Sequence, residues 1–222
     1  MVSKIGGDHD KARIREVWEG SSCFLQEMWE DKVLIIVLVH IDDCTIVGKI
    51  LLLINQFKVE IVKYVDITDM GDLHWILRIE VHQIHEEQKM LLSQQSYIDS
   101  ILQWYSFEEL KPVSTPMDPN SRLTSMQSPS TTEEFAVMRN VPYHEAIGSL
   151  MYAMLGTQPD ICFAVQTVSR FNSKPRLPHW EAVKRIFKYL KGTKGLWLGY
   201  GGQAKELMGL LDFVLPLKQN PT

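Results

Sequence analysis

A run of seven apolar residues, most of them β-branched, stands near the start of the chain at Val33–Val39 (VLIIVLV). Its composition predicts a buried strand that continues to Ile41, and it is far shorter than the roughly 20 residues that a membrane-spanning helix needs. Asp42 and Asp43 interrupt the apolar character, which resumes at 44–47 (CTIV). This succession predicts a β-hairpin with two carboxylates at its turn.

The composition is that of an ordinary globular protein and excludes several classes. Among the 222 residues, 45% are hydrophobic and 23% are charged, which argues against a disordered chain. The three cysteines (Cys23, Cys44 and Cys162) lie far apart without a CxxC pair, so neither structural zinc nor a disulfide framework is expected. The net charge of −4 means that any binding of nucleic acid must be local. Since no export signal or membrane segment is recognisable, an intracellular location is expected, in either cytoplasm or nucleus.

Periodicity and turn residues predict an α+β fold in two unequal parts. After the hairpin, the first part is expected to contain one amphipathic helix, two short strands and a second helix capped by Ser93, at 49–64, 75–81, 90–92 and 94–102. The second part is expected to contain three helices that begin at prolines, at 142–155, 159–171 and 178–190. Gly192 is predicted to cap the last of these helices, and 196–200 with 207–211 indicates the start of a new sheet.

The adjacent carboxylates of Asp42 and Asp43 need a physical reason. Two like charges 4 Å apart repel by about 1 kcal/mol in water and by more in a partly buried site. A divalent cation is the usual compensation, and Mg²⁺ prefers a few carboxylates together with water and phosphate oxygens. The alternative is a simple polar turn, and from the acidic pair alone this alternative is the better interpretation.

The surrounding residues change that balance. The stretch VLVHIDDCTIVG resembles the YxDD polymerase motif of reverse transcriptases, in a variant with His at the aromatic position. Further stretches follow in the same order as in one group of these enzymes: DMGDLHWILRIEV, LLSQQSYIDSIL, LKPVSTPMDPN, YHEAIGSLMYAMLGTQPDICFAVQTVSRF and HWEAVKRIFKYLKGTKGLWLGY. Together they resemble the reverse transcriptase region of copia-type LTR retrotransposon polyproteins, over about residues 31–200.

The resemblance implies the activity of an RNA-directed DNA polymerase. Asp42 and Asp43 match the acidic pair that binds the catalytic Mg²⁺ ions of the palm, and His40 matches a position near the primer end. The implied partner is an RNA–DNA or DNA primer–template duplex. Deoxynucleoside triphosphates are the only small molecules that the intact family implies, and no membrane is involved.

Several departures from the family pattern predict that this chain is inactive by itself. In the family a further catalytic aspartate comes from an earlier palm strand, and the fingers also precede the acidic pair. The 41 residues before Asp42 contain no recognisable counterpart, although Asp8 and Asp10 are nominal candidates. Asp212 matches the first metal-binding aspartate of an RNase H domain, but the sequence after it departs from that pattern at once. Arg78 replaces a usual Gly, and we expect this long cation at a close-packed strand position to cost stability.

The resemblance also predicts the organisation of the chain. It assigns a partial palm to 31–110 and a helical region similar to a thumb or connection to 142–194. A Pro-, Ser- and Thr-rich linker is expected at 111–141, draped over a surface. The segment 195–222 resembles the truncated start of an RNase H-like region, and residues 1–30 remain unassigned.

A basic segment is the second candidate site. Between Arg170 and Lys194 the chain holds eight Lys or Arg residues and a single acid, Glu181. Four of these cations occupy one predicted helix and could contact a phosphate backbone: Lys184, Arg185, Lys188 and Lys191. The alternative is a solvated helix face. Two further functions therefore remain open, a non-enzymatic remnant that binds nucleic acid and the product of a decayed element without function.

Overall fold

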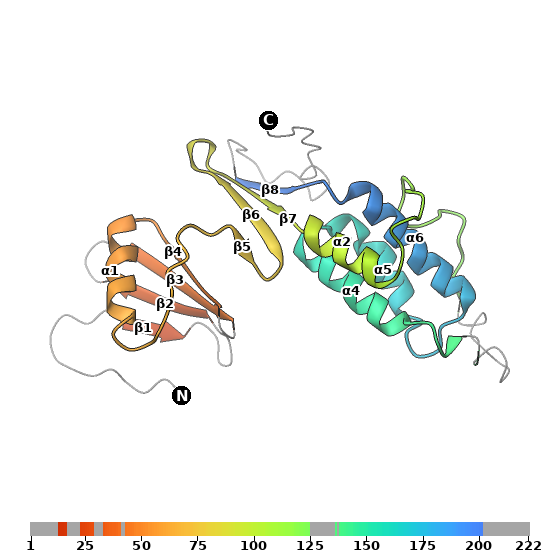
Figure 1. Cartoon of the computed structure of the whole chain (residues 1–222), viewed down its shortest axis with the longest axis horizontal. Helices are drawn as coiled ribbons and strands as arrows, with labels where there is room; N and C mark the ends of the chain where they lie inside the picture. Colours follow the sequence, from red (N-terminus) through yellow and green to blue (C-terminus); the bar gives the residue numbers. More distant parts are fainter. Residues whose placement is uncertain are drawn as a thin grey trace. The chain divides into compact units, whose positions relative to one another are not determined.

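The computed structural model describes residues 13–16, 23–28, 33–40, 43–124, 136 and 138–201. The chain forms two compact units, residues 1–73 and residues 74–222, which are described separately below (Figure 1). No helix within these described ranges has both the length and the apolar character needed to cross a lipid bilayer.

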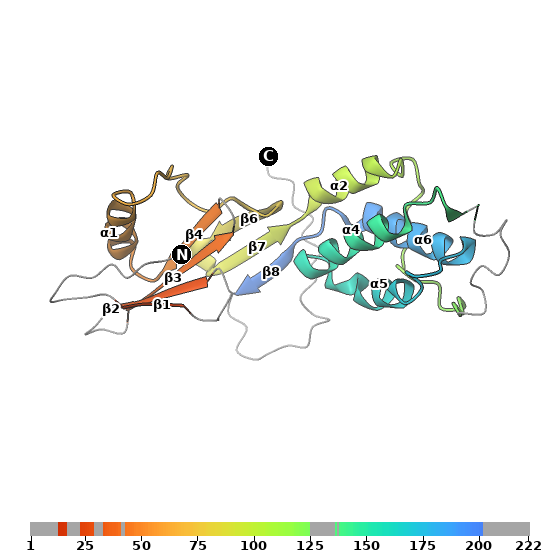
Figure 2. The same ribbon diagram turned by 90° about the horizontal axis from the view of Figure 1, so that it is seen from below.

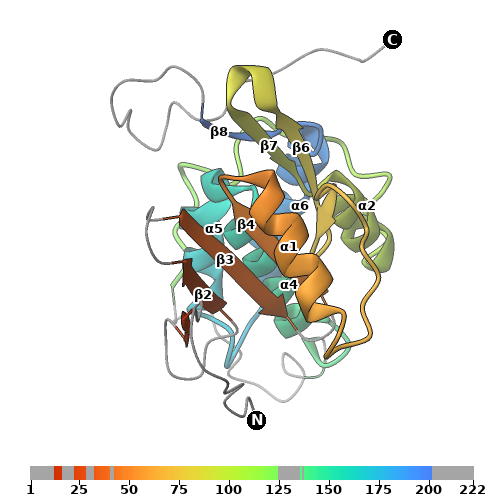
Figure 3. The same ribbon diagram turned by 90° about the vertical axis from the view of Figure 1, so that its left-hand side faces the viewer.

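The described residues of the first unit form an antiparallel sheet and one helix. The strands are joined in the order β1-β2-β3-β4, so each strand pairs with its neighbours in sequence. Helix α1 (Leu51–Ile61) follows the last strand and lies across one face of the sheet (Figure 3). The strands are β1 (Arg13–Glu16), β2 (Cys23–Met28), β3 (Val33–His40) and β4 (Asp43–Gly48).

The β3–β4 hairpin buries one face against α1. Ile35 and Val37 point to that face and are 1% and 5% exposed. Gly48 lies opposite Ile35 in the register, and a Cβ at Gly48 would lie 3.1 Å from the side chain of Ile54 in α1. Because side chains alternate along a strand, Leu38 lies on the other face, where it is exposed. The predicted hairpin is confirmed, except that Asp43, predicted at the turn, is already the first residue of β4.

The second unit combines a second antiparallel sheet with a helical bundle (Figure 2). The sheet has the order β5-β6-β7-β8: β5 (Trp75–Ile76), β6 (Ile79–Ile84), β7 (Lys89–Ser93) and β8 (Leu198–Gly201). The helices are α2 (Gln95–Trp104), α4 (Tyr143–Gly156), α5 (Cys162–Ser169) and α6 (Leu177–Thr193). The described residues of this unit also form the short 3₁₀ helices η1 (His85–Glu87) and η3 (Pro159–Ile161).

One hydrophobic core holds these helices together. Phe187 of α6 is fully buried, and its ring centroid lies 5.2 Å from that of Tyr105 and 5.2 Å from that of Phe107. Tyr143 is also buried, and its hydroxyl donates a hydrogen bond of 2.8 Å to the carbonyl oxygen of Val168. Burial therefore raises the pKa of the Tyr143 hydroxyl. The predicted α+β class is confirmed, while the assignments to palm and thumb stay predictions.

Several predicted elements differ in the structure. The single helix predicted at 159–171 is divided into η3 and α5. The segment 198–201 extends an existing sheet by pairing with β7, instead of starting a new one, and 207–211 lies outside the described residues. Gly192 does not cap α6 but lies inside it, where a Cβ would come 3.2 Å from the side chain of Pro112. Its role is close packing.

The predicted strand at 75–81 is divided between β5 and β6, because the chain turns back within it. Trp75 pairs with Glu80 and Ile76 with Ile79, so Leu77 and Arg78 form a two-residue hairpin turn. Their φ angles are +48° and +61°, in the left-handed region that such turns require and that Gly and Asn adopt most easily. The cost of Arg78 therefore comes from its backbone conformation and not from a close-packed strand position.

Side-chain contacts compensate part of this cost. The guanidinium carbon of Arg78 lies 5.8 Å from the ring centroid of Trp104, an arrangement that permits a cation–π interaction. The hydroxyl of Tyr152 in α4 donates a hydrogen bond to the carbonyl oxygen of Leu77. The turn is thus tied to two helices of the second unit.

Replacement of Arg78 separates the cost of its left-handed backbone from the gain of its contact with Trp104. Arg78→Gly and Arg78→Ala both lose the contact with Trp104, but only Gly relieves the left-handed strain. We expect Arg78→Gly to be more stable than Arg78→Ala by about 1 kcal/mol in urea unfolding, with the native chain between them. Equal stability of the two variants would show that the turn carries no backbone strain.

Candidate functional site

The acidic hairpin turn lies at the last rung of the β3–β4 ladder. His40 is the last residue of β3 and pairs with Asp43, the first residue of β4. Both side chains are exposed. Ile41 and Asp42, the two residues between them, lie outside the described residues. The structure therefore brings together two of the three residues predicted for this site.

His40 and Asp43 share the sheet face that α1 does not cover. Directly paired residues point to the same face of an antiparallel sheet, and faces alternate with a period of two. Leu38 lies on the same face as His40, whereas Val37 is buried on the face toward α1. The turn thus presents its imidazole and its carboxylate to the same side of the sheet.

The carboxylate of Asp43 has the properties of a cation ligand. It forms no ion pair or side-chain hydrogen bond with any other residue that the structure describes. A carboxylate oxygen is the kind of ligand that Mg²⁺ prefers. The neighbouring thiol of Cys44 is less suited, because partial burial raises its pKa and disfavours the thiolate. The donor chemistry at this turn therefore fits a hard divalent cation.

A complete metal site is not present in the described part of the chain. Within the described ranges, no three or more His, Cys, Asp and Glu side chains are grouped so that they could hold a metal ion. Asp42, Asp8 and Asp10 lie outside those ranges. Asp212, the predicted RNase H-like residue, also lies outside them. The predicted roles of these four aspartates stay predictions.

The four predicted phosphate-binding cations all lie on α6, but three of them have partners within the chain. Lys184 forms an ion pair of 2.8 Å with Glu181. Lys191 donates a hydrogen bond to the carbonyl oxygen of Glu108. Arg185 donates a hydrogen bond of 2.9 Å from Nη2 to the hydroxyl of Thr115. Lys188 has no hydrogen-bond or ion-pair partner among the described residues.

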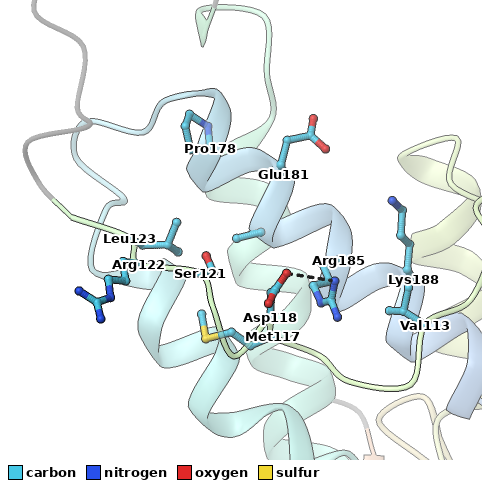
Figure 4. A pocket seen from close by; sticks show the side chains of 11 residues that line it. Val113, Met117, Asp118, Ser121, Arg122, Leu123, Pro178, Glu181, Arg185 and Lys188 are labelled. Carbon is cyan, nitrogen blue, oxygen red and sulfur yellow. Dashed lines mark ion pairs between the residues drawn. The ribbon is translucent and has the colours of Figure 1, made fainter.

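The partners of Arg185 come from residues 111–124, here called the strap, which lie along α6. The strap and α6 enclose a pocket of about 390 Å³ that Lys188, Arg185 and Asp118 help to line (Figure 4). In this pocket a carboxylate oxygen of Asp118 lies 4.0 Å from Nη1 of Arg185. Met117 and Leu123 of the strap pack against the hydrophobic core.

A buried histidine holds the end of the strap. His179 is fully buried at the start of α6 and stacks on Phe171 with 4.0 Å between the ring centroids. Its Nδ1 accepts a hydrogen bond from the backbone N–H of Arg176, and its Nε2 lies 3.4 Å from the carbonyl oxygen of Thr124. Burial lowers the pKa of His179, so the neutral form that this geometry needs is favoured.

Comparison with known proteins bears on the acidic turn. A family model described as reverse transcriptase (RNA-dependent DNA polymerase) matches residues 11–119. The chain is also 41% identical, over 190 residues and 86% of its length, to the retrovirus-related Pol polyprotein from transposon TNT 1-94 of Nicotiana tabacum. The chain belongs to the reverse transcriptase region of copia-type retrotransposon polyproteins. The acidic turn lies inside the residues matched to the family model, whereas α6 lies beyond them.

Two further relatives of this copia-type region come from Arabidopsis thaliana. The Pol polyproteins from transposons RE1 and RE2 are each 32% identical to it, over 77% and 76% of the chain. The chain spans only 14% of the length of the TNT 1-94 polyprotein and 11% of each of the other two. No solved structure gives a significant match.

Proposed function

We propose that the β3–β4 hairpin of this copia-type region is the metal-binding corner of a reverse transcriptase palm. In this proposal Asp42 and Asp43 bind Mg²⁺, and His40 lies beside the primer end. The observation that carries the proposal is the register of the hairpin, which sets the exposed carboxylate of Asp43 opposite His40 on the face that α1 leaves uncovered. A primer–template duplex could reach both side chains from that face.

The proposed chemistry is phosphoryl transfer from a deoxynucleoside triphosphate to a primer hydroxyl. Bound Mg²⁺ would neutralise the charge that develops on the transferred phosphoryl group. In this chemistry Asp43 would hold the cation at the hairpin turn, because its carboxylate forms no ion pair with another described residue. The pairing of His40 with Asp43 in the β3–β4 ladder would keep that carboxylate at a fixed distance from His40.

We infer that the 222-residue chain does not extend primers by itself. In this family the adjacent pair is only part of the metal site, since a further aspartate from another palm strand completes it. Catalysis of phosphoryl transfer depends almost entirely on positioning and on the metal ions, so an incomplete site forfeits most of the rate. The acidic pair alone would hold the cation only loosely.

Primer extension with the purified chain tests this inference. With an RNA template, a DNA primer, deoxynucleoside triphosphates and Mg²⁺, we expect no product above that of the Asp43→Asn variant. Extension by the native chain that Asp43→Asn abolishes would overturn the claim of inactivity but support the assignment of the turn. Extension that Asp43→Asn leaves unchanged would overturn both.

A second proposal assigns α6 to the binding of nucleic acid. Lys184, Lys188 and Lys191 follow one another at spacings of four and three residues, so they lie along one face of the helix. Lys188 can bind a phosphate directly, because it has no hydrogen bond or ion pair with a described residue that would first have to break. The partners of Arg185 and Lys191 would have to be exchanged for phosphate oxygens, which makes their contribution smaller than that of free cations.

Binding to a fluorescent RNA–DNA duplex at several salt concentrations tests the second proposal. We expect Lys188→Glu to weaken binding and to reduce the slope of log affinity against log salt by about 1. Lys174→Glu, which changes an exposed lysine outside α6, is the matched control and should have a smaller effect. Binding that neither variant alters, or that does not depend on salt, would contradict a role for this helix face.

A further inference from the structure

Neither proposed function gives a role to Thr115, the strap residue that contacts Arg185. Thr115 lies in the strap and is exposed, and its hydroxyl accepts the 2.9 Å hydrogen bond from Nη2 of Arg185. Pro116 follows it directly in the sequence. An exposed hydroxyl in an irregular segment, followed by proline, is accessible to an enzyme that modifies Ser or Thr in extended chains.

Arg185 has more hydrogen-bonding capacity than its present partners use. Its Nε is buried and has no hydrogen-bond partner among the described residues. The nearest carboxylate oxygen, on Asp118, lies 4.0 Å from Nη1, which is too long for a hydrogen bond. Lys188 lines the same pocket without a described partner (Figure 4). The neighbourhood of Thr115 therefore holds two cations that are incompletely neutralised.

We propose that Thr115 is a phosphorylation site for a proline-directed Ser/Thr kinase and that Arg185 binds the resulting phosphate. The kinase transfers the γ-phosphoryl group of ATP to Oγ1 of Thr115. A bond forms between Oγ1 and phosphorus, the bond between the γ-phosphorus and the bridging oxygen of ADP breaks, and the hydroxyl proton passes to the base of the kinase. The products are phosphothreonine and ADP, and no other co-reactant is needed.

The charge of the phosphate gives this modification its effect. A phosphothreonine carries a charge of about −1.5 to −2 at pH 7 and three strong acceptor oxygens. A guanidinium group presents donors in a planar fork that matches a phosphate, and such charge-assisted hydrogen bonds are stronger than the present bond to a neutral hydroxyl. The phosphate would thus replace the long contact to Asp118 and fasten the strap to α6.

Thr115 is distinguished from its neighbours by sequence and by contact. Ser114 is adjacent but is not followed by proline. Apart from Thr115, Ser128 is the other hydroxyl residue of the chain that directly precedes a proline. Ser128 lies outside the described residues. The Ser128→Ala background therefore leaves Thr115 as the single hydroxyl directly before a proline. The proposal does not depend on the polymerase or nucleic-acid proposals above.

The test uses the full chain, ATP and a purified mitogen-activated protein kinase. In the Ser128→Ala background, mass spectrometry should locate one phosphate on Thr115, and Thr115→Ala should remove it. Phosphorylation should raise the melting temperature by about 2–4 °C and slow trypsin cleavage after Arg122, near the end of the strap.

The dependence on Arg185 decides whether the phosphate is bound as proposed. Each variant is compared with its own unphosphorylated form, so a general loss of stability cancels. Arg185→Gln should abolish the rise in melting temperature, and Arg185→Lys, which keeps the charge without the fork, should retain part of it. Absence of phosphate on Thr115, or an equal shift in the native chain and in Arg185→Gln, would overturn the proposal.

Discussion

Gly156→Ala is expected to lower the free energy of unfolding by about 2–4 kcal/mol. Gly156 is the last residue of α4, and a Cβ there would lie 2.5 Å from Cδ of Gln94, well inside van der Waals contact. Gln94 is 1% exposed. Its Oε1 accepts hydrogen bonds from the backbone N–H of Thr157 at 2.9 Å and from the hydroxyl of Thr157 at 3.1 Å.

The end of a glutamine side chain usually moves aside at little cost, but here it cannot. Displacing the amide would break both hydrogen bonds to Thr157 and leave buried donors without acceptors. Rotating the amide by half a turn would place Nε2, itself a donor, against the backbone N–H of Thr157. Gly156 is therefore required because Gln94 occupies the space of a Cβ at the junction between α2 and α4.

Gly148→Ala is the matched control in the same helix. No atom lies within 4 Å of a Cβ built at Gly148, so alanine should fit there and stabilise the helix by roughly 0.5–1 kcal/mol. Urea unfolding followed by circular dichroism measures both variants. A cost below about 0.5 kcal/mol for Gly156→Ala, or an equal effect of the two substitutions, would mean that Gln94 can leave its buried position.

The local elements could be predicted because adjacent residues determine them. A continuous apolar run followed by an acidic pair predicts the β3–β4 hairpin, since both signals lie within 16 residues. The apolar stripe that predicts the helix after Ser93 is the buried face of α2, formed by Tyr97, Ile98, Ile101 and Leu102. Ser93, predicted as the cap, instead ends β7 one residue before the N-cap Gln94, although its hydroxyl accepts a hydrogen bond from the N–H of Gln95.

Other features depend on parts of the chain that are distant in sequence. Pairing of β8 with β7 joins Tyr200 to Met90, and a short apolar segment does not reveal its partner. The β5–β6 turn was missed because Leu77 and Arg78 lack the Gly or Asn that normally signals it. Contacts with Trp104 and Tyr152, from two different helices, help to hold the turn instead.

The candidate sites also differ in how far they could be predicted from neighbouring residues. The hairpin follows from a short motif and could be predicted, but its register could not: the sequence favours both aspartates at the turn, whereas Asp43 begins β4 and pairs with His40. The contacts of Arg185 with Thr115 and Asp118 could not, because these residues are about 70 positions apart. Helix periodicity predicts which cations share a face but not which other segment covers it.

The metal site carries the second large prediction. Asp43→Asn is expected to weaken the binding of a divalent cation at the hairpin by at least about ten-fold, which corresponds to about 1.4 kcal/mol. The reason is that an amide oxygen lacks the charge that attracts the cation, while the shape of the turn is kept. Asp66→Asn, which changes another exposed carboxylate of the first unit, is the matched control and should have no effect.

Titration of the ¹⁵N-labelled chain with Mn²⁺, followed by NMR, is the most direct measurement. Mn²⁺ accepts the same carboxylate ligands as Mg²⁺ and broadens the signals of nearby nuclei. We expect selective broadening of the amide signals of Val39, His40, Cys44 and Thr45, which competes with Mg²⁺ and disappears in Asp43→Asn. Broadening centred elsewhere, or unchanged by Asp43→Asn, would contradict the assignment of this turn as the metal-binding corner of the palm.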